Sequence, residues 1–133
     1  MVITEAALED VEVLSELDRH LRKENLPRKI RDKEILVLRK DDKIVGWLRY
    51  GYFWDNLPFM NLLFILEPYR FQGLGSRLVA HWEQAMKERG HRIVMTSTQA
   101  DEEGQHFYRK LGYRDIGGFV LPGEPLELIM IKE

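Results

Sequence analysis

The sequence of 133 residues contains no cysteine, which excludes disulfide bonds, thiolate metal ligands and a cysteine nucleophile. It has no apolar run of about 18 residues either, so no segment has the length of a membrane-spanning helix. The opening stretch, MVITEAALED, lacks a basic segment followed by an apolar one, which is the pattern of a secretory signal. A soluble, cytoplasmic protein without membrane partners is therefore expected.

An excess of one charge sign is also missing. The 20 Lys and Arg residues nearly balance the 22 Asp and Glu residues and leave a net charge of -2, so no nucleic-acid-binding surface is expected. The four histidines (His20, His81, His91 and His106) show no metal-ligand spacing, and we expect no metal site. Seven basic residues lie between Arg19 and Lys33. They fit a solvated face better than a site for an anionic acceptor, although both readings stay open.

The apolar content, 44% of residues, is enough for the core of one globular domain, which we expect over residues 1–133. Periodicity predicts strands at 34–40, 43–54, 59–66, 92–97, 113–120 and 126–132, and helices at 8–21, 74–89 and 101–110. Residues 1–5 read as a strand or as the lead into a helix, and Asn25-Leu26-Pro27 reads as a break after the first helix. The strand at 59–66 is apolar on both faces, which indicates a covered, central position. The order predicts an α/β fold with a mostly antiparallel first half.

The stretch LEPYRFQGLGSRL, residues 66–78, joins a strand to a helix through two glycines. The N-terminus of a helix leaves backbone N–H groups unpaired and carries partial positive charge, so it attracts anions. Gly73 and Gly75 remove side chains that would keep a phosphate away, and Arg70 adds a permanent charge. The plainer alternative is that the glycines only shape a tight turn. A dinucleotide-binding fingerprint fits poorly, because it needs glycine where Leu78 stands and an acid after the strand at 92–97.

A second motif, HFYRKLGY at residues 106–113, joins a short helix to a strand. Together with the R-x-x-G-x-G of residues 70–75, it makes nearly the whole chain resemble the GCN5-related N-acetyltransferase (GNAT) family. The resemblance implies a mixed central sheet of about seven strands flanked by helices. It also implies acetyl-CoA as cosubstrate, with no metal.

Residue roles follow from this resemblance only where the motifs match. The loop backbone of Phe71, Gln72, Gly73, Leu74, Gly75 and Ser76 would hold the pyrophosphate of coenzyme A, with Arg70 beside it. Ile65 and Leu66 would pair their backbone with the amides of the pantetheine arm. Tyr108 would face the thioester sulfur as general acid, since a phenol can hydrogen-bond or protonate a departing thiolate.

Two assignments stay open at this level. The general base would be Glu67, just after the central strand, or Asp55, although both also read as surface carboxylates; a water chain or an amine of low pKa would make either unnecessary. Asp101 stands where many relatives have an asparagine that contacts the cofactor. It also fits the N-cap of the last helix, with Glu102 and Glu103 in the first turn, and then Gln99 or Gln105 would make the contact.

The expected activity is transfer of an acetyl group from acetyl-CoA to a primary amine, by direct attack in a ternary complex. The acceptor, a small molecule or a peptide, is not readable from the sequence, and neither is a homodimer of the kind common among these folds. Two alternatives remain: a catalytically silent domain that binds coenzyme A, and a nucleotide-binding oxidoreductase.

Overall fold

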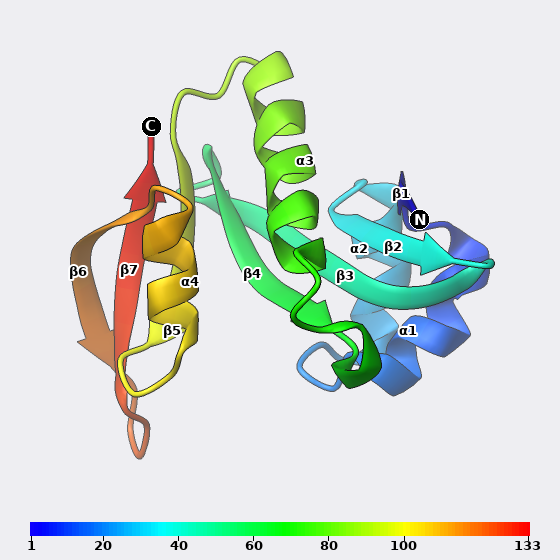
Figure 1. Cartoon of the computed structure of the whole chain (residues 1–133), viewed down its shortest axis with the longest axis horizontal. Coiled ribbons are helices and arrows are strands. Elements are labelled where there is room, and N and C mark those ends of the chain that lie inside the picture. The colour runs from blue at the N-terminus through cyan, green and yellow to red at the C-terminus, as the bar shows by residue number, and fades with distance from the viewer. The chain divides into compact units, whose positions relative to one another are not determined.

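The computed structural model describes residues 1–133 (Figure 1). Its helices are α1 (Val11–Leu17), α2 (Leu26–Arg31), α3 (Leu74–Glu88) and α4 (Gly104–Lys110). Its strands are β1 (Val2–Glu5), β2 (Ile35–Lys40), β3 (Lys43–Phe53), β4 (Leu57–Ile65), β5 (Val94–Gln99), β6 (Arg114–Val120) and β7 (Leu126–Lys132). Three short 3-10 turns lie at Leu8–Asp10, Lys23–Asn25 and Glu67–Tyr69. The seven strands form a mixed sheet in the order β1-β2-β3-β4-β5-β7-β6, which confirms the expected fold class.

Contacts divide the chain into two compact units. The first consists of Met1–Arg49 and Leu62–His81, and the second of Tyr50–Asn61 and Trp82–Glu133. The division runs through β3, β4 and α3. The single domain expected over residues 1–133 stays a prediction.

In the first unit, β2 pairs antiparallel with both β1 and β3. One face of β2 and β3 is covered by α1 and α2 through the buried side chains of Ala6, Leu14, Leu26, Ile30, Ile35, Val37, Ile44 and Trp47. A second cluster contains Leu38, Val45 and Leu74, the first residue of α3. Because successive strand residues point to opposite faces, Val37 and Leu38 serve these two different clusters.

The register of β2 and β3 shifts after Leu38, which pairs with Gly46, while Arg39 pairs with Ile44. Val45 is therefore the extra residue of a β-bulge. A methyl group at Gly46 would lie 2.6 Å from Ile65 Cδ1 and 3.1 Å from the Phe64 carbonyl oxygen. Glycine thus lets β3 come close to the end of β4, the segment that leads into the loop.

A buried ion pair fastens the end of α1 to β3 in this unit. Asp18 and Arg49 are 2% and 7% exposed, and Arg49 Nε donates to Asp18 Oδ2 at 2.8 Å. The same carboxylate accepts the Trp47 indole N–H at 3.3 Å and the His20 backbone N–H at 3.1 Å. One carboxylate therefore fixes the chain where it leaves α1.

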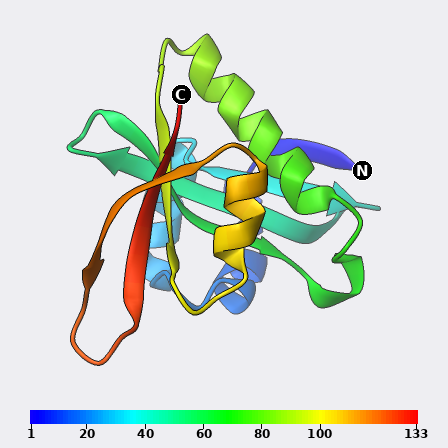
Figure 2. The same cartoon turned by 60° about the vertical axis from the view of Figure 1, so that its left-hand side comes forward.

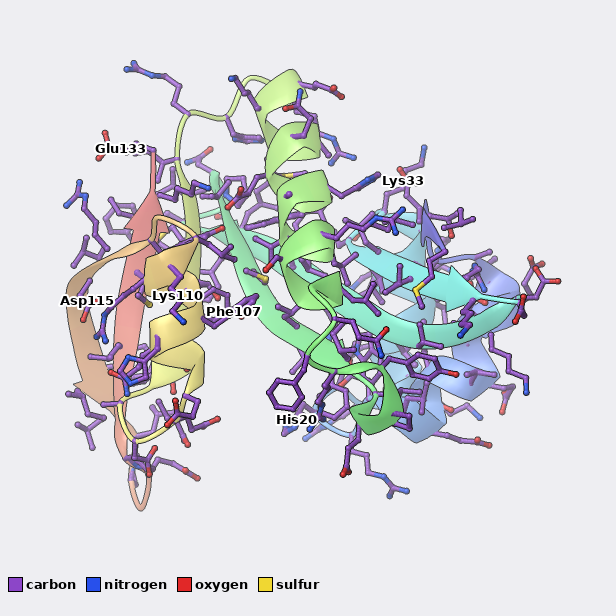
Figure 3. All side chains as sticks on the ribbon, in the orientation of Figure 1. His20, Lys33, Phe107, Lys110, Asp115 and Glu133 are labelled. Carbon is purple, nitrogen blue, oxygen red and sulfur yellow. The ribbon has the colours of Figure 1, made fainter.

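In the second unit, β5 pairs in parallel with β4, at Phe59 with Met95 and at Met60 with Thr96, and antiparallel with β7. Helix α4 lies against β5, and the β6–β7 hairpin extends beyond the ends of both (Figures 1 and 2). An ion pair ties α4 to β6, because Arg109 Nη2 lies 2.8 Å from Asp115 Oδ2; Figure 3 labels this aspartate.

The structure corrects three expectations near helix ends. The first helix ends at Leu17 instead of continuing to Leu21. The segment read as a break starts α2, with Pro27 in its first turn, where a proline loses no hydrogen bond. Helix α4 begins at Gly104 with Glu103 as its N-cap residue, so the expectation that Asp101 caps it was wrong.

The expectation that β4 is central is confirmed, because it is the fourth strand of seven. The expectation that both its faces are covered is wrong for its second half. There Asn61 is exposed, and Phe64 is 37% exposed although one side of its ring stacks on the buried Trp47.

Candidate functional site

The segment between β4 and α3 has the geometry of an anion-binding loop. Gly73 has a φ of +76°, a conformation that side chains other than glycine strain to adopt. The Arg77 N–H donates to the Gly73 carbonyl at 3.1 Å, as the first turn of α3 requires. The N–H groups of Leu74, Gly75 and Ser76 come before this first helical hydrogen bond, so the helix itself offers them no acceptor. They lie at the positive end of a helix of 15 residues. Of the two glycines, Gly73 makes the turn and Gly75 is already helical.

Arg70, four residues before α3, is held in place by the end of β4. Its Nε donates to the Ile65 carbonyl at 2.8 Å, and its guanidinium lies 5.0 Å from the centre of the Phe64 ring. Phe64 in turn stacks on the buried Trp47, with ring centroids 5.1 Å apart. The two terminal nitrogens of Arg70 make no hydrogen bond or ion pair within the protein, so their N–H groups are available to an anion.

The backbone of Ile65 and Leu66 was expected to bind the cosubstrate's amides. The Leu66 N–H donates to the Val45 carbonyl at 2.9 Å, and its carbonyl accepts the Tyr69 N–H at 2.9 Å. Both polar groups of Leu66 are therefore engaged within the protein. Because neighbouring residues of a strand point their backbone groups to opposite edges, those of Ile65 point away from β3. The Ile65 carbonyl is bound to Arg70. Of these backbone groups, the Ile65 N–H is therefore the one that suits the expected contact.

Tyr108 lies on α4, in the second unit, and is 8% exposed. Its ring packs edge-on against Phe107 and Tyr113, with centroids 5.1 and 5.6 Å away. Burial raises the pKa of Tyr108 to about 12, and a hydrogen-bonding interaction with the Thr96 side chain offsets part of the rise. The phenol is thus fully protonated at neutral pH, which a proton donor requires.

Tyr113 supports Tyr108 from the end of the same motif. Its hydroxyl donates to Glu83 Oε2 at 2.7 Å, and Lys132 Nζ lies 3.0 Å from Glu83 Oε1. Burial, followed by the hydrogen bond to the Glu83 carboxylate, raises the pKa of Tyr113 well above its usual value. This cluster links α3, β7 and the start of β6, and fixes the ring on which Tyr108 packs.

The other predicted residues lie at the surface. Glu67 is exposed in the 3-10 turn after β4, and Asp55 is exposed in the β3–β4 hairpin with a φ of +61°. Asp101 is exposed in the turn before α4. The amide nitrogen of Gln105 donates to the carbonyls of Ala100 and Glu102, at 2.7 and 2.9 Å, so its side chain stabilises that turn. Gln99 donates to Glu124 at 3.3 Å.

Two residues that organise these features were not identified from the sequence. Phe64 orients Arg70, and Thr96 lies beside the Tyr108 hydroxyl. Phe64 gave no clear signal, because Tyr69 and Phe71 stand closer to Arg70 in the sequence. Thr96 gives no signal, because its partners lie 12 and 36 positions away.

The described chain contains no group of three or more His, Cys, Asp or Glu residues placed to hold a metal ion. None of its helices is both long and apolar enough to cross a membrane.

Comparison with known proteins gives the family. The model of the acetyltransferase (GNAT) family matches residues 3–113, so the chain belongs to this family, as the two motifs predicted. No curated protein is similar enough in sequence to be matched.

Solved structures share the fold at low sequence identity. Ard1 from Thermoplasma volcanium is 18% identical, with a TM-score of 0.84 over 98% of this chain and 95% of that one. The PaiA N-acetyltransferase from Thermoplasma acidophilum, solved in complex with coenzyme A, is 20% identical, with a TM-score of 0.76 over 99% and 98%. Naa50 from Arabidopsis thaliana, in complex with the bisubstrate analogue CoA-Ac-MVNAL, is 17% identical, with a TM-score of 0.77 over 99% and 97%.

Proposed function

We propose that this member of the GNAT family transfers an acetyl group from acetyl-CoA to a primary amine by direct attack in a ternary complex. The observation that carries the proposal is Arg70, fixed by the Ile65 carbonyl and the Phe64 ring, with its terminal nitrogens unpaired in the loop that leads into the N-terminus of α3. This combination suits the pyrophosphate of coenzyme A, which needs a fixed cation and several convergent N–H donors. Coenzyme A is bound in the PaiA relative, which supports the choice of anion.

Acetyl-CoA supplies an acetyl group activated as a thioester. The neutral amine attacks the thioester carbon, the carbon–sulfur bond breaks, and the amine loses a proton. In the proposed roles, the N–H groups from Phe71 to Ser76 and the Arg70 guanidinium bind the pyrophosphate, and Ile65 pairs with an amide of the pantetheine arm. Asp101 is exposed and accessible for a contact with the cosubstrate.

Tyr108 is the proposed general acid. Its pKa of about 12 lies above that of a cysteine-like thiol, about 8.5, so complete transfer of its proton to the departing thiolate would cost on the order of 5 kcal/mol. Tyr108 therefore acts mainly by donating a hydrogen bond to the sulfur as negative charge develops there. The proton that the amine loses goes to Glu67 or to water; the exposure of Glu67 favours water.

The acceptor is proposed to be a small-molecule or peptide amine. The relative in complex with CoA-Ac-MVNAL carries a peptide part in its ligand, which supports a peptide acceptor. A screen of amines and of peptides with free N-termini, read by the release of free thiol, would identify the acceptor. Binding of acetyl-CoA without thiol release from any acceptor would favour the catalytically silent domain.

The cosubstrate site is tested by calorimetry with acetyl-CoA. Arg70→Ala is expected to raise the Kd at least tenfold, because a charge-assisted hydrogen bond is worth about 1.5–3 kcal/mol. Arg22→Ala is the matched control. Arg22 is exposed, and its only ion pair is a long one of 3.8 Å to Glu24, so this variant removes the same charge and leaves the proposed site unchanged. Equal affinities of the two variants, or no heat with the natural sequence, would contradict the proposal.

A further inference from the structure

The face of β5 that α4 covers carries two buried threonines. Thr96 is 1% exposed and Thr98 is 9% exposed. They are two positions apart on one strand, so their side chains share a face. A buried hydroxyl requires a hydrogen-bond partner, and the partner of Thr96 is the carbonyl of Met60, 3.0 Å from its Oγ1.

This bond determines what Thr96 offers to Tyr108. A threonine hydroxyl has a single proton, and Thr96 gives it to Met60. Toward Tyr108 it therefore has only lone pairs, so in a hydrogen bond between the two hydroxyls the phenol is the donor.

Gly104 keeps α4 close enough for this arrangement. A methyl group at Gly104 would lie 2.8 Å from Thr98 Oγ1, closer than real side chains approach, and 3.9 Å from Tyr108 Cε2. The first residue of α4 thus rests directly on β5, at a distance that glycine alone permits. One turn later the same helix places Tyr108 beside Thr96.

We propose that Thr96 is a positioning residue for Tyr108, an inference that rests on the proposed acetyl transfer. As Tyr108 turns its O–H toward the departing sulfur, the Thr96 hydroxyl turns from the Met60 carbonyl and donates to the phenolic oxygen. No proton leaves Thr96. Its dipole stabilises the negative charge that grows on the phenol oxygen while the phenol shares its proton with the thiolate.

Kinetics separate this role from simple packing. Thr96→Val keeps the shape of the side chain and is expected to lower kcat about tenfold, the effect of one lost hydrogen bond, with the KM for acetyl-CoA unchanged. Thr96→Ser retains the hydroxyl and should keep most of the activity. Thr98→Val is the matched control on the same face and should keep kcat. In a Tyr108→Phe background, Thr96→Val should cause no further loss; an equal loss in both backgrounds would overturn the proposal.

An NMR measurement that does not depend on catalytic turnover distinguishes this inference from the proposed function. The ring-carbon resonance next to the Tyr108 hydroxyl, assigned by its absence in Tyr108→Phe, should shift in Thr96→Val and stay in place in Thr98→Val. A resonance that does not move in Thr96→Val overturns the positioning role, whatever the activity. If the resonance shifts but the protein acetylates no amine, the result supports the contact between Thr96 and Tyr108 and contradicts the acetyltransferase proposal instead.

Discussion

Replacement of Tyr108 by phenylalanine is expected to lower kcat for acetyl transfer by on the order of 10², the lower end of the range for a positioned proton donor. The lower end applies because the pKa of about 12 restricts Tyr108 to hydrogen-bond donation, without complete proton transfer. Phenylalanine keeps the ring contacts with Phe107 and Tyr113, so the fold should be retained. Binding of coenzyme A, measured by calorimetry, should not change.

The control for this substitution is Tyr69→Phe. It also removes one hydroxyl, from a half-buried tyrosine whose hydroxyl makes no hydrogen bond in the protein. Tyr69→Phe should keep the natural kcat. If both variants keep full activity, Tyr108 is not the acid; if Tyr108→Phe also loses coenzyme A binding, its effect is structural.

The pH dependence of the rate provides a companion test. A raised pKa means that Tyr108 keeps its proton well beyond pH 10, where an ordinary tyrosine ionises. The donor form is present below its pKa and is lost only as the pH rises toward about 12. The rate should therefore show no alkaline decline from this group up to about pH 11. A decline centred near pH 9 that disappears in Tyr108→Phe would contradict this assignment.

Replacement of Asp18 by alanine is expected to lower the free energy of unfolding by about 3–5 kcal/mol, a large part of the 5–15 kcal/mol typical of a domain. The variant leaves the Arg49 guanidinium buried without its counter-charge and removes the acceptor of the Trp47 indole N–H. Urea unfolding with a common slope would measure the loss.

An exposed ion pair is the control for Asp18→Ala. Glu12 lies on α1, the helix that ends just before Asp18, and contacts Lys23 at 3.1 Å, but the two side chains are 76% and 58% exposed. Glu12→Ala should therefore change stability by no more than about 1 kcal/mol. Similar losses for Asp18→Ala and Glu12→Ala would show that burial does not decide the strength of these pairs.

Local patterns and motifs carried most of the sequence-based prediction. The hairpin at Asp41-Asp42 and the last two strands were confirmed, because alternating apolar residues and turn residues determine them locally. The loop was found because Arg70, Gly73 and Gly75 are close together in the chain. Helix α2 was missed because Pro27 was interpreted as a break, although proline is also favoured in the first turn of a helix.

What the sequence did not predict depends on pairing between distant residues. Asp18 and Arg49 are 31 positions apart, and although Arg49 stands in an apolar strand, nothing in the sequence marks Asp18 as its partner. Thr96 becomes significant only when α4 rests on β5 through Gly104. Tertiary packing determines which distant residues meet, and the periodicity of a single sequence carries no information about it.

The strand order also has a consequence for synthesis on the ribosome. β5 has β7 as its antiparallel neighbour, and β7 is translated after β5, α4 and β6. At a translation rate of about 5–20 residues per second, one edge of β5 stays unpaired for about a second or more until β7 has been synthesised. The second unit therefore closes its sheet late, and in that interval the unpaired edge is where a nascent chain would be most prone to non-native pairing.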